Sequence, residues 1–180
     1  MVSLEEIKSQ ARVAHDEEDT LLARLVDAAT RHVEQRTRRA LITQTWRLSL
    51  DEFPCEAIYV PRPPLIAVSS IAYIDEEGDS QTLSSALYRV DAARHPGRIT
   101  PAWGESWPVA LAIVNAVTVT HTAGYGSSPS DVPEDLRHAV LLLASHWFDE
   151  RGAVLVGSIS KTIEFAVESL CEPYEVESYA

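Results

Sequence analysis

The sequence has few of the residues that mark secreted or membrane-spanning proteins. Among 180 residues there are only two cysteines, Cys55 and Cys171, too few for a disulfide framework. We expect two buried free thiols, with one bridge as the alternative. The longest apolar runs, 109–114 and 139–144, fall far short of the about 20 residues of a membrane span. Because the first residues also lack the basic and apolar parts of a signal peptide, we predict a soluble protein made in a reducing cytoplasm, with no membrane partner.

Basic residues are scarce as well. Lys and Arg number 15 against 27 Asp and Glu, so the formal net charge is −12. Residues 1–42 carry a net charge of −1, residues 43–132 carry −5 and residues 133–180 carry −6, and no base follows Lys161. This balance argues against a protein that grips a phosphate backbone. It leaves room for a surface that DNA passes without binding.

Helical patterns occur at the two ends of the chain. Ser3 and Glu6 have the spacing of a capping box at the start of a short helix. Residues 16–38 have apolar side chains at helical spacing, with acids at the start and bases at the end, as the helix dipole favours. Pro133 is suited to the first turn of a third helix, and a fourth is expected over 162–170.

The middle of the chain has the period-two pattern of β-strands. Trp46, Leu48 and Leu50 fall on one face of a strand over 45–50. Residues 75–79, with Gly78, are typical of a hairpin turn. Further β-rich runs are 58–60, 68–74, 81–83, 88–90, 97–99 and 116–122. Turns join consecutive strands, so the sheet should be mainly antiparallel.

The predicted fold class is therefore α+β. We expect one domain, a helical bundle of two N-terminal and two C-terminal helices with an inserted, mainly antiparallel β-rich lobe. The expected segments are N-terminal helices over 1–42, a β-rich insert over 43–132, C-terminal helices over 133–170 and a tail over 171–180.

No residue pattern predicts a catalytic, cofactor or metal site. His138 and His146 are eight residues apart on one predicted helix, too far along its axis to share a metal ion. Ser158 and Lys161 have the S-x-x-K spacing of penicillin-recognising serine enzymes, but the companion motifs are missing. We expect no enzyme activity, no cofactor and no metal.

Two groups of residues have both a structural and an interface interpretation. Arg36, Arg38 and Arg39 could be a solvated helix end that benefits from the dipole, or could contact an acidic neighbour or nucleic acid. Trp103 and Trp107 could pack within a loop, or could anchor an interface, since Trp is enriched at binding hot spots.

As an ordered set, the segments of this chain resemble the head–tail connector proteins of tailed phages, also called adaptor or head-completion proteins, which have relatives in phage-like gene transfer agents. The resemblance covers nearly the whole chain, although the role of residues 153–161 matches no pattern. The stretches that carry it include DEEDTLL (16–22), RALITQTW (39–46), PRPPL (61–65), YRVD (88–91), TAGYG (122–126) and VPEDL (132–136).

This resemblance implies a virion structural protein at the head–tail interface. Such proteins form a ring, usually dodecameric, under the portal protein; the ring extends the DNA channel and docks the tail or a stopper protein, while DNA passes without specific binding. It also implies that C-terminal residues engage the portal, here Tyr174, Val176 and Tyr179. For contacts between subunits we expect residues of the long helix and the aromatic loop, namely Asp16, Glu17, Arg36, Arg38, Arg39, Trp103 and Trp107.

Two other functions remain open at this point. One is a tail-completion or tail-terminator protein, which is also ring-forming and differs in its position along the particle. The other is a small cytoplasmic enzyme whose site is assembled from distant residues, for instance His121 with Glu134.

Overall fold

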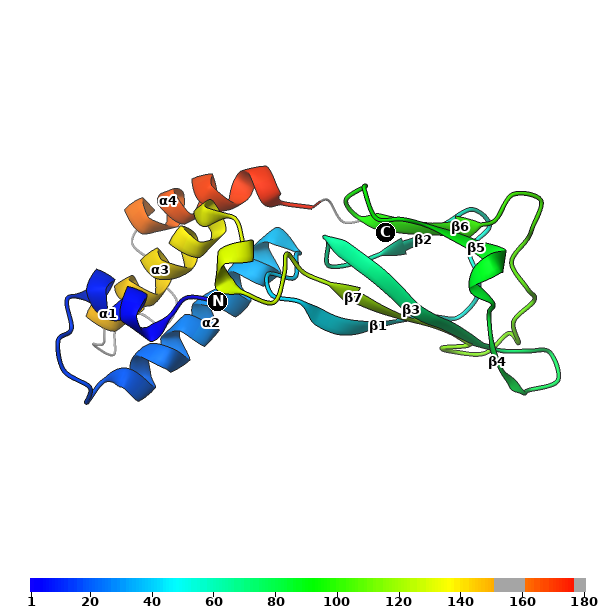
Figure 1. The fold of residues 1–180 in the computed structure, drawn as a ribbon, viewed down its shortest axis with the longest axis horizontal. Coiled ribbons are helices and arrows are strands. Elements are labelled where there is room, and N and C mark those ends of the chain that lie inside the picture. The colour runs from blue at the N-terminus through cyan, green and yellow to red at the C-terminus, as the bar shows by residue number, and fades with distance from the viewer. Residues whose placement is uncertain (151–160, 177–180) are drawn as a thin grey trace. The chain divides into compact units, whose positions relative to one another are not determined.

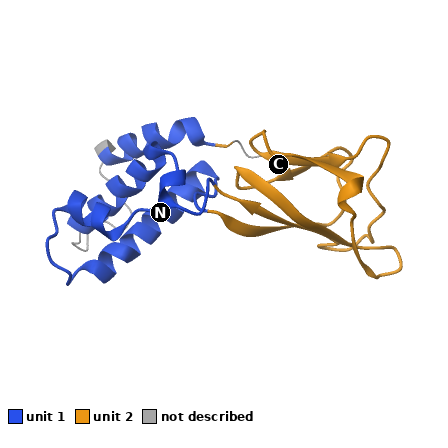
Figure 2. Ribbon diagram, viewed as in Figure 1, with its two compact units in different colours: residues 1–42, 125–175 blue, residues 43–124, 176–180 orange. Residues whose placement is uncertain are grey.

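The chain folds into two compact units, one helical and one built of strands (Figure 2). The computed structural model describes residues 1–150 and 161–176. Residues 1–42 and 125–175 make the helical unit, and the β unit is built on residues 43–124. This arrangement confirms the predicted α+β class with an inserted β-rich lobe. The predicted insert extended to residue 132, whereas the structure groups residues 125–132 with the helices.

The described part of the helical unit contains four α-helices (Figure 1). They are α1 (Leu4–Ala11), α2 (Asp19–Thr37), α3 (Glu134–Asp149) and α4 (Lys161–Cys171), with the short 3-10 turns η2 (Pro129–Asp131) and η3 (Glu172–Tyr174). The predicted capping box at the start of α1 is present, because Ser3 accepts from the backbone of Glu6 and Glu6 accepts from the backbone of Ser3. Helix α2 begins at Asp19 rather than Asp16, since residues 16–18 form a turn.

Helix α3 is the centre of this unit and packs against α1, α2 and α4. Apolar side chains at helical spacing on each helix form one buried cluster, which includes Ile7, Leu22, Val26, Val33, Leu136, Val140, Leu143, Val167 and Cys171. Burying a large aliphatic side chain contributes about 1.5–3 kcal/mol. The contacts of α3 therefore join the N-terminal and C-terminal parts of the chain into one core.

The β unit contains two antiparallel sheets. The larger sheet has the strand order β1-β7-β3-β4, and the smaller has the order β2-β6-β5. Their bounds are β1 (Gln44–Leu50), β2 (Ile58–Val60), β3 (Leu65–Ile74), β4 (Ser80–Thr82), β5 (Tyr88–Asp91), β6 (Gly97–Pro101) and β7 (Val117–Ala123). The 3-10 turn η1 (Ser85–Leu87) precedes β5.

Side chains from both sheets share one apolar core. Every second residue of the central strand β7 is buried, at Val117, Val119, His121 and Ala123. Ile58, Val60, Tyr88 and Ile99 of the small sheet pack into the same cluster as Ile71, Val117 and Val119 of the large one. This alternation of buried and exposed positions is the pattern expected of a sheet with one face on the core.

Candidate interaction surfaces

Three loops meet at one end of the large sheet. Leu50, at the end of β1, and Tyr73, near the end of β3, both pair with Val117, where β7 begins. The loops that follow β1 and β3 and the loop that precedes β7 therefore lie at the same end. We call the loops 51–57, 75–79 and 102–116 together the sheet-end surface.

Hydrogen bonds and aromatic contacts hold these loops together. The Asp51 carboxylate accepts a 2.8 Å bond from the backbone of Asn115, and the backbone N–H of Leu111 donates to the carbonyl of Ile74. Within 75–79, the predicted hairpin turn is present: the backbone N–H of Asp75 donates to the carbonyl of Asp79, and Gly78 takes a φ of 90°. Each loop is therefore anchored to the sheet or to a neighbouring loop.

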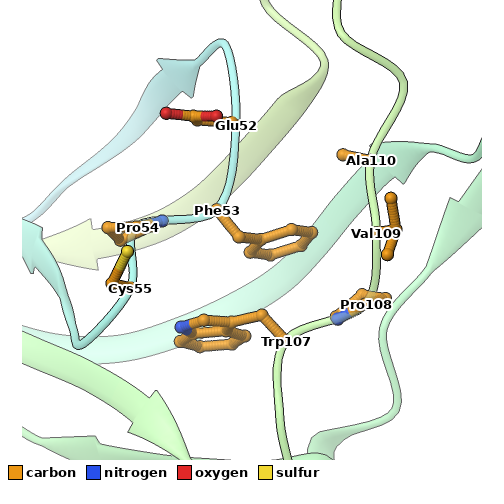
Figure 3. A pocket seen from close by; sticks show the side chains of 8 residues that line it. All are labelled: Glu52, Phe53, Pro54, Cys55, Trp107, Pro108, Val109 and Ala110. Atoms are coloured by element: carbon orange, nitrogen blue, oxygen red, sulfur yellow. The ribbon is translucent and has the colours of Figure 1, made fainter.

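An open pocket of about 330 Å³ lies between the first and third loops (Figure 3). The rings of Phe53 and Trp107 stack with their centroids 5.2 Å apart and an interplanar angle of 13°. Phe53 also makes an edge contact with Tyr73 of β3, at 5.6 Å between centroids. The remaining lining residues are Glu52, Pro54, Cys55, Pro108, Val109 and Ala110.

The two tryptophans that were expected to act together have different environments. Trp107 is half-buried in the stacked pair, whereas Trp103 is 100% exposed. The loop turns sharply beside Trp103, because Glu105 donates to the carbonyl of Ala102 and Gly104 takes a φ of 82°. Trp107 thus has a packing role within the chain, while Trp103 has none.

In the helical unit, the residues after α4 are fixed to the end of α2. The guanidinium of Arg39 donates to the carbonyl oxygen of Tyr174 at 2.6 Å, and the Tyr174 hydroxyl donates to Asp135 at 3.0 Å. Burial, reinforced by the hydrogen bond to the Asp135 carboxylate, raises the pKa of Tyr174. Tyr174 is therefore half-buried, and both its carbonyl oxygen and its hydroxyl are hydrogen-bonded within this unit.

The other two arginines of the helix end differ in their contacts. Arg36 pairs with Glu168 at 3.2 Å and with Glu175 at 3.0 Å, so it bridges α2, α4 and the segment after η3. Arg38 is exposed and caps the helix end in the left-handed region, with a φ of 56°. A role for these residues between subunits remains a prediction.

The acidic residues before α2 form the corner between α1 and α2. The ammonium group of Lys8 contacts the carboxylates of Asp16 at 2.5 Å and Asp19 at 2.8 Å. The hydrogen bond from Lys8 lowers the pKa of Asp16. Glu17 is exposed beside this cluster.

Of the remaining predicted tail contacts, Val176 is half-buried, and Tyr179 lies outside the described residues. Residues 153–160, whose role was left open, also lie outside them.

Both described cysteines are free thiols. Cys55 is exposed, so the expectation that both thiols are buried is wrong for Cys55, which lies in the exposed first loop. Cys171 is buried, and burial raises its pKa to about 11.

The described residues show no group of three or more His, Cys, Asp or Glu that could hold a metal ion. The two residues named for an enzyme site have structural environments. His121 is fully buried within β7, and Glu134 is exposed on α3 and pairs with Arg137. In the described part of the chain, no helix has the length and apolarity needed to cross a membrane.

This fold, a helical unit with an inserted β unit, has counterparts among known proteins. The sequence model of the phage gp6-like head-tail connector protein family matches residues 1–92. The chain belongs to this family. As a connector, it is a structural component of the virion at the head–tail interface. No curated protein matches it.

Solved structures similar to this connector come from gene transfer agent particles. A chain of the virion of a native particle is 25% identical and superposes with a TM-score of 0.80, covering 99% of the connector and 91% of that chain. A neck chain of an empty particle, computed with C6 symmetry, is 26% identical with a TM-score of 0.75 and covers 99% and 91%. A neck chain of a native particle, computed with C12 symmetry, is 27% identical with a TM-score of 0.70 and covers 100% and 94%.

Several contacts of the connector had no signal in the sequence. Phe53, which stacks on Trp107, and Tyr73, which contacts Phe53, lie in a loop and a strand to which the sequence assigned no special role. Asp135 and Glu175 were recognisable only as acids of a helix start and of the tail. The aromatic side chain of Phe53, directly after the acidic Asp51 and Glu52, is the one signal in the sequence that this loop folds back on the sheet.

Proposed function

We propose that this connector is a head–tail adaptor that forms a ring beneath the portal, extends the DNA channel and docks the tail or its stopper. The observation that carries the proposal is the likeness over nearly the whole chain to neck chains of gene transfer agent particles, one of them computed with C12 symmetry. A symmetric ring requires one patch of each subunit to meet a different patch of the next.

The exposed groups at the two ends of α2 are candidates for the ring contacts. Asp16 and Glu17 lie in the turn before its first residue, and Arg38 lies at its end with no ion pair to another described residue. Arg36 and Arg39 are bound to the C-terminal segment, so any part they take in the ring includes that segment. Acidic residues of one subunit and Arg38 of the next have the opposite charges that such a heterologous contact needs.

The portal contact is assigned to the end of the chain. Arg36, Arg39 and Asp135 hold Tyr174 and Glu175 on the helical unit, so the proposed contact falls mainly on the residues that follow. Val176 and Tyr179 supply apolar side chains for a portal groove, with Tyr174 at their base.

The net charge suggests a use along the DNA path. The excess of acids lies after residue 42, and carboxylates on the channel wall repel DNA phosphates and lower friction during packaging and ejection. A basic channel wall in the assembled ring, with the acids facing outward, would contradict this part of the proposal.

Co-sedimentation with the portal protein tests the proposed function. The full chain should sediment with portal rings, and a truncation after Glu175 should not, while keeping its fold. A truncation after Leu170 would also remove Cys171 and Tyr174, which pack in the helical unit, so it cannot separate docking from folding. Failure of the full chain to bind portal rings, or binding only to tail-tube rings, would favour a tail-completion protein instead.

A further inference from the structure

The third loop of the sheet-end surface exposes an unusual amount of apolar surface. Trp103 is 100% exposed, Val114 is 75%, Val109 is 64% and Ile113 is 47%. All four lie on one loop of fifteen residues. Single exposed apolar residues need no explanation, but a group of them marks an interaction site. Tryptophan is moreover the residue type most enriched at binding hot spots.

Beside this loop, the pocket between Phe53 and Trp107 offers a place for a partner's side chain. Most of its lining side chains are apolar, namely two prolines, Val109, Ala110 and the stacked aromatic pair, while Glu52 and Cys55 complete the lining (Figure 3). The stacking and the edge contact of Phe53 with Tyr73 give these walls a fixed shape. A preformed pocket lowers the ordering cost of binding.

The charge around these apolar groups has one sign only. The loops 51–57, 75–79 and 102–116 contain three, four and one carboxylates and no Lys or Arg, so they hold eight of the nine acids of residues 43–124. Seven of the eight are exposed; Asp75 is half-buried and accepts bonds from Asp79 and Gln81. The sheet-end surface is therefore complementary to a basic surface with apolar side chains.

We infer that the sheet-end surface docks the tail-side neighbour of the connector, a different protein that presents Lys or Arg around an apolar side chain seated in the Phe53–Trp107 pocket. This inference rests on the proposed function and adds the site and the chemistry of one of its partners. A second copy of the chain is the less suitable occupant. Glu105 lies close to Trp103 in the sequence, and Glu52 lines the pocket. If Trp103 of one copy entered the pocket of another copy, these two carboxylates would come together and repel each other.

Charge reversal at exposed positions tests the inference in assembled particles. Heads carrying the full-length double variant Glu76→Lys and Glu77→Lys are mixed with purified tails of the same particle, and joined particles are counted by electron microscopy. The matched control is Asp27→Lys with Glu150→Lys, which changes the charge equally at exposed positions of the helical unit. We expect the test variant to remain on heads in the parental amount and to join tails about tenfold less, as loss of one favourable charge contact predicts. The control should join tails normally.

Trp103→Ser should reproduce this loss without a change of charge. Tail joining at the parental level by both test variants would overturn the inference. So would loss of the test variants, but not of the control, from heads, because the surface would then be a contact between copies. Absence of the parental chain from heads is a separate result that would overturn the proposed function.

An exposed cysteine in the pocket allows a second test by chemical labelling. Cys55 is exposed and lines the pocket, whereas the Cys171 thiol is buried with a raised pKa. Iodoacetamide should therefore alkylate Cys55 and leave Cys171 unmodified, and mass spectrometry can follow both. We expect Cys55 to react on free chains and on tail-less heads, and its rate to fall about tenfold or more once tails join. Equal reactivity before and after joining, or protection already complete on tail-less heads, would contradict the inference.

Discussion

Arg39, two residues after the end of α2, donates a 2.6 Å hydrogen bond to the carbonyl oxygen of Tyr174, 135 residues later in the chain. Arg39 is only 8% exposed, so this contact is part of the packed helical unit. The predicted tail was expected to begin at residue 171, yet Cys171 and Tyr174 belong to that unit. The helical unit therefore extends to Glu175, and the short segment that follows is the part to test for portal docking.

Replacing Arg39 by alanine should loosen the segment after α4. The change leaves the Tyr174 carbonyl without its charged donor, which costs about 1–3 kcal/mol. We expect a lower free energy of unfolding in urea and faster amide hydrogen exchange over residues 171–175. Arg24→Ala, at an exposed position of the same helix, is the control and should change neither. Unchanged exchange in Arg39→Ala would show that the contact does not hold the segment.

The capping box of α1 should make stability depend on pH in the acid range. Hydrogen bonds from Ser3 and the charge of Arg137 hold the pKa of Glu6 below its ordinary 4.5. The lowered pKa means that this contribution is present above pH about 4.5 and is lost as the pH falls through the folded-state pKa. Glu6→Gln should therefore reduce the loss of folding stability between pH 5 and 3, as measured by urea titration. This pH range follows from the lowered pKa of Glu6.

Ser3→Ala removes the other half of the same box. It should lower the free energy of unfolding by about 0.5–2 kcal/mol, the usual cost of losing a helix cap. Ser9→Ala, at an exposed position within α1, should have a negligible effect. A Ser3→Ala protein as stable as the parent would mean that α1 is held by its packing on α3 alone.

The two tryptophans of the third loop should behave oppositely in stability measurements. Trp107→Ala removes the ring that stacks on Phe53 and should cost at least about 2 kcal/mol, since aromatic truncations at packed sites cost about 3–5 and this one is half-buried. Trp103→Ser should stay within about 0.5 kcal/mol of the parent, because its side chain is fully exposed. Thermal unfolding of both variants tests the contrast; a large loss in Trp103→Ser would show an unrecognised packing role.

The buried His121 should make the stability of the fold depend on pH near neutrality. Its burial within β7, which outweighs the nearby backbone of Pro61 and Val119, lowers the pKa of His121 below its ordinary 6.5. Protons then bind the unfolded chain more readily, so stability is complete above pH about 6.5 and decreases as the pH falls below it, by at most about 1.4 kcal/mol per pH unit. His121→Leu should reduce the change in the urea midpoint of unfolding between pH 7 and 5. His15→Gln, at an exposed position, should not.

Local features of the fold could be predicted from the sequence because their causes are local. The Ser3–Glu6 box, the 75–79 turn and the alternation along β7 depend on residues near one another in the chain, and each was found where expected. The α2 boundary was misplaced by three residues. The acids at 16–18 suit a helix start, but Lys8 draws Asp16 into the corner with α1 instead.

Contacts between distant segments could not be predicted in the same way. The pairing of β7 between β1 and β3, and of Arg36 with Glu175, joins residues tens to more than a hundred positions apart. One sequence shows which side chains are charged or apolar but not which pairs meet. For this reason the two tryptophans were considered as a pair, either packed in a loop or anchoring an interface, although of the two only Trp107 stacks on Phe53.

Imaging of intact particles tests the central claim most directly. A reconstruction of the neck of the phage or gene transfer agent that encodes this chain should show it as a closed ring between portal and tail, with residues after Glu175 against the portal and the sheet-end surface toward the tail. A neck without this chain, or the chain found only along the tail tube, would contradict the account.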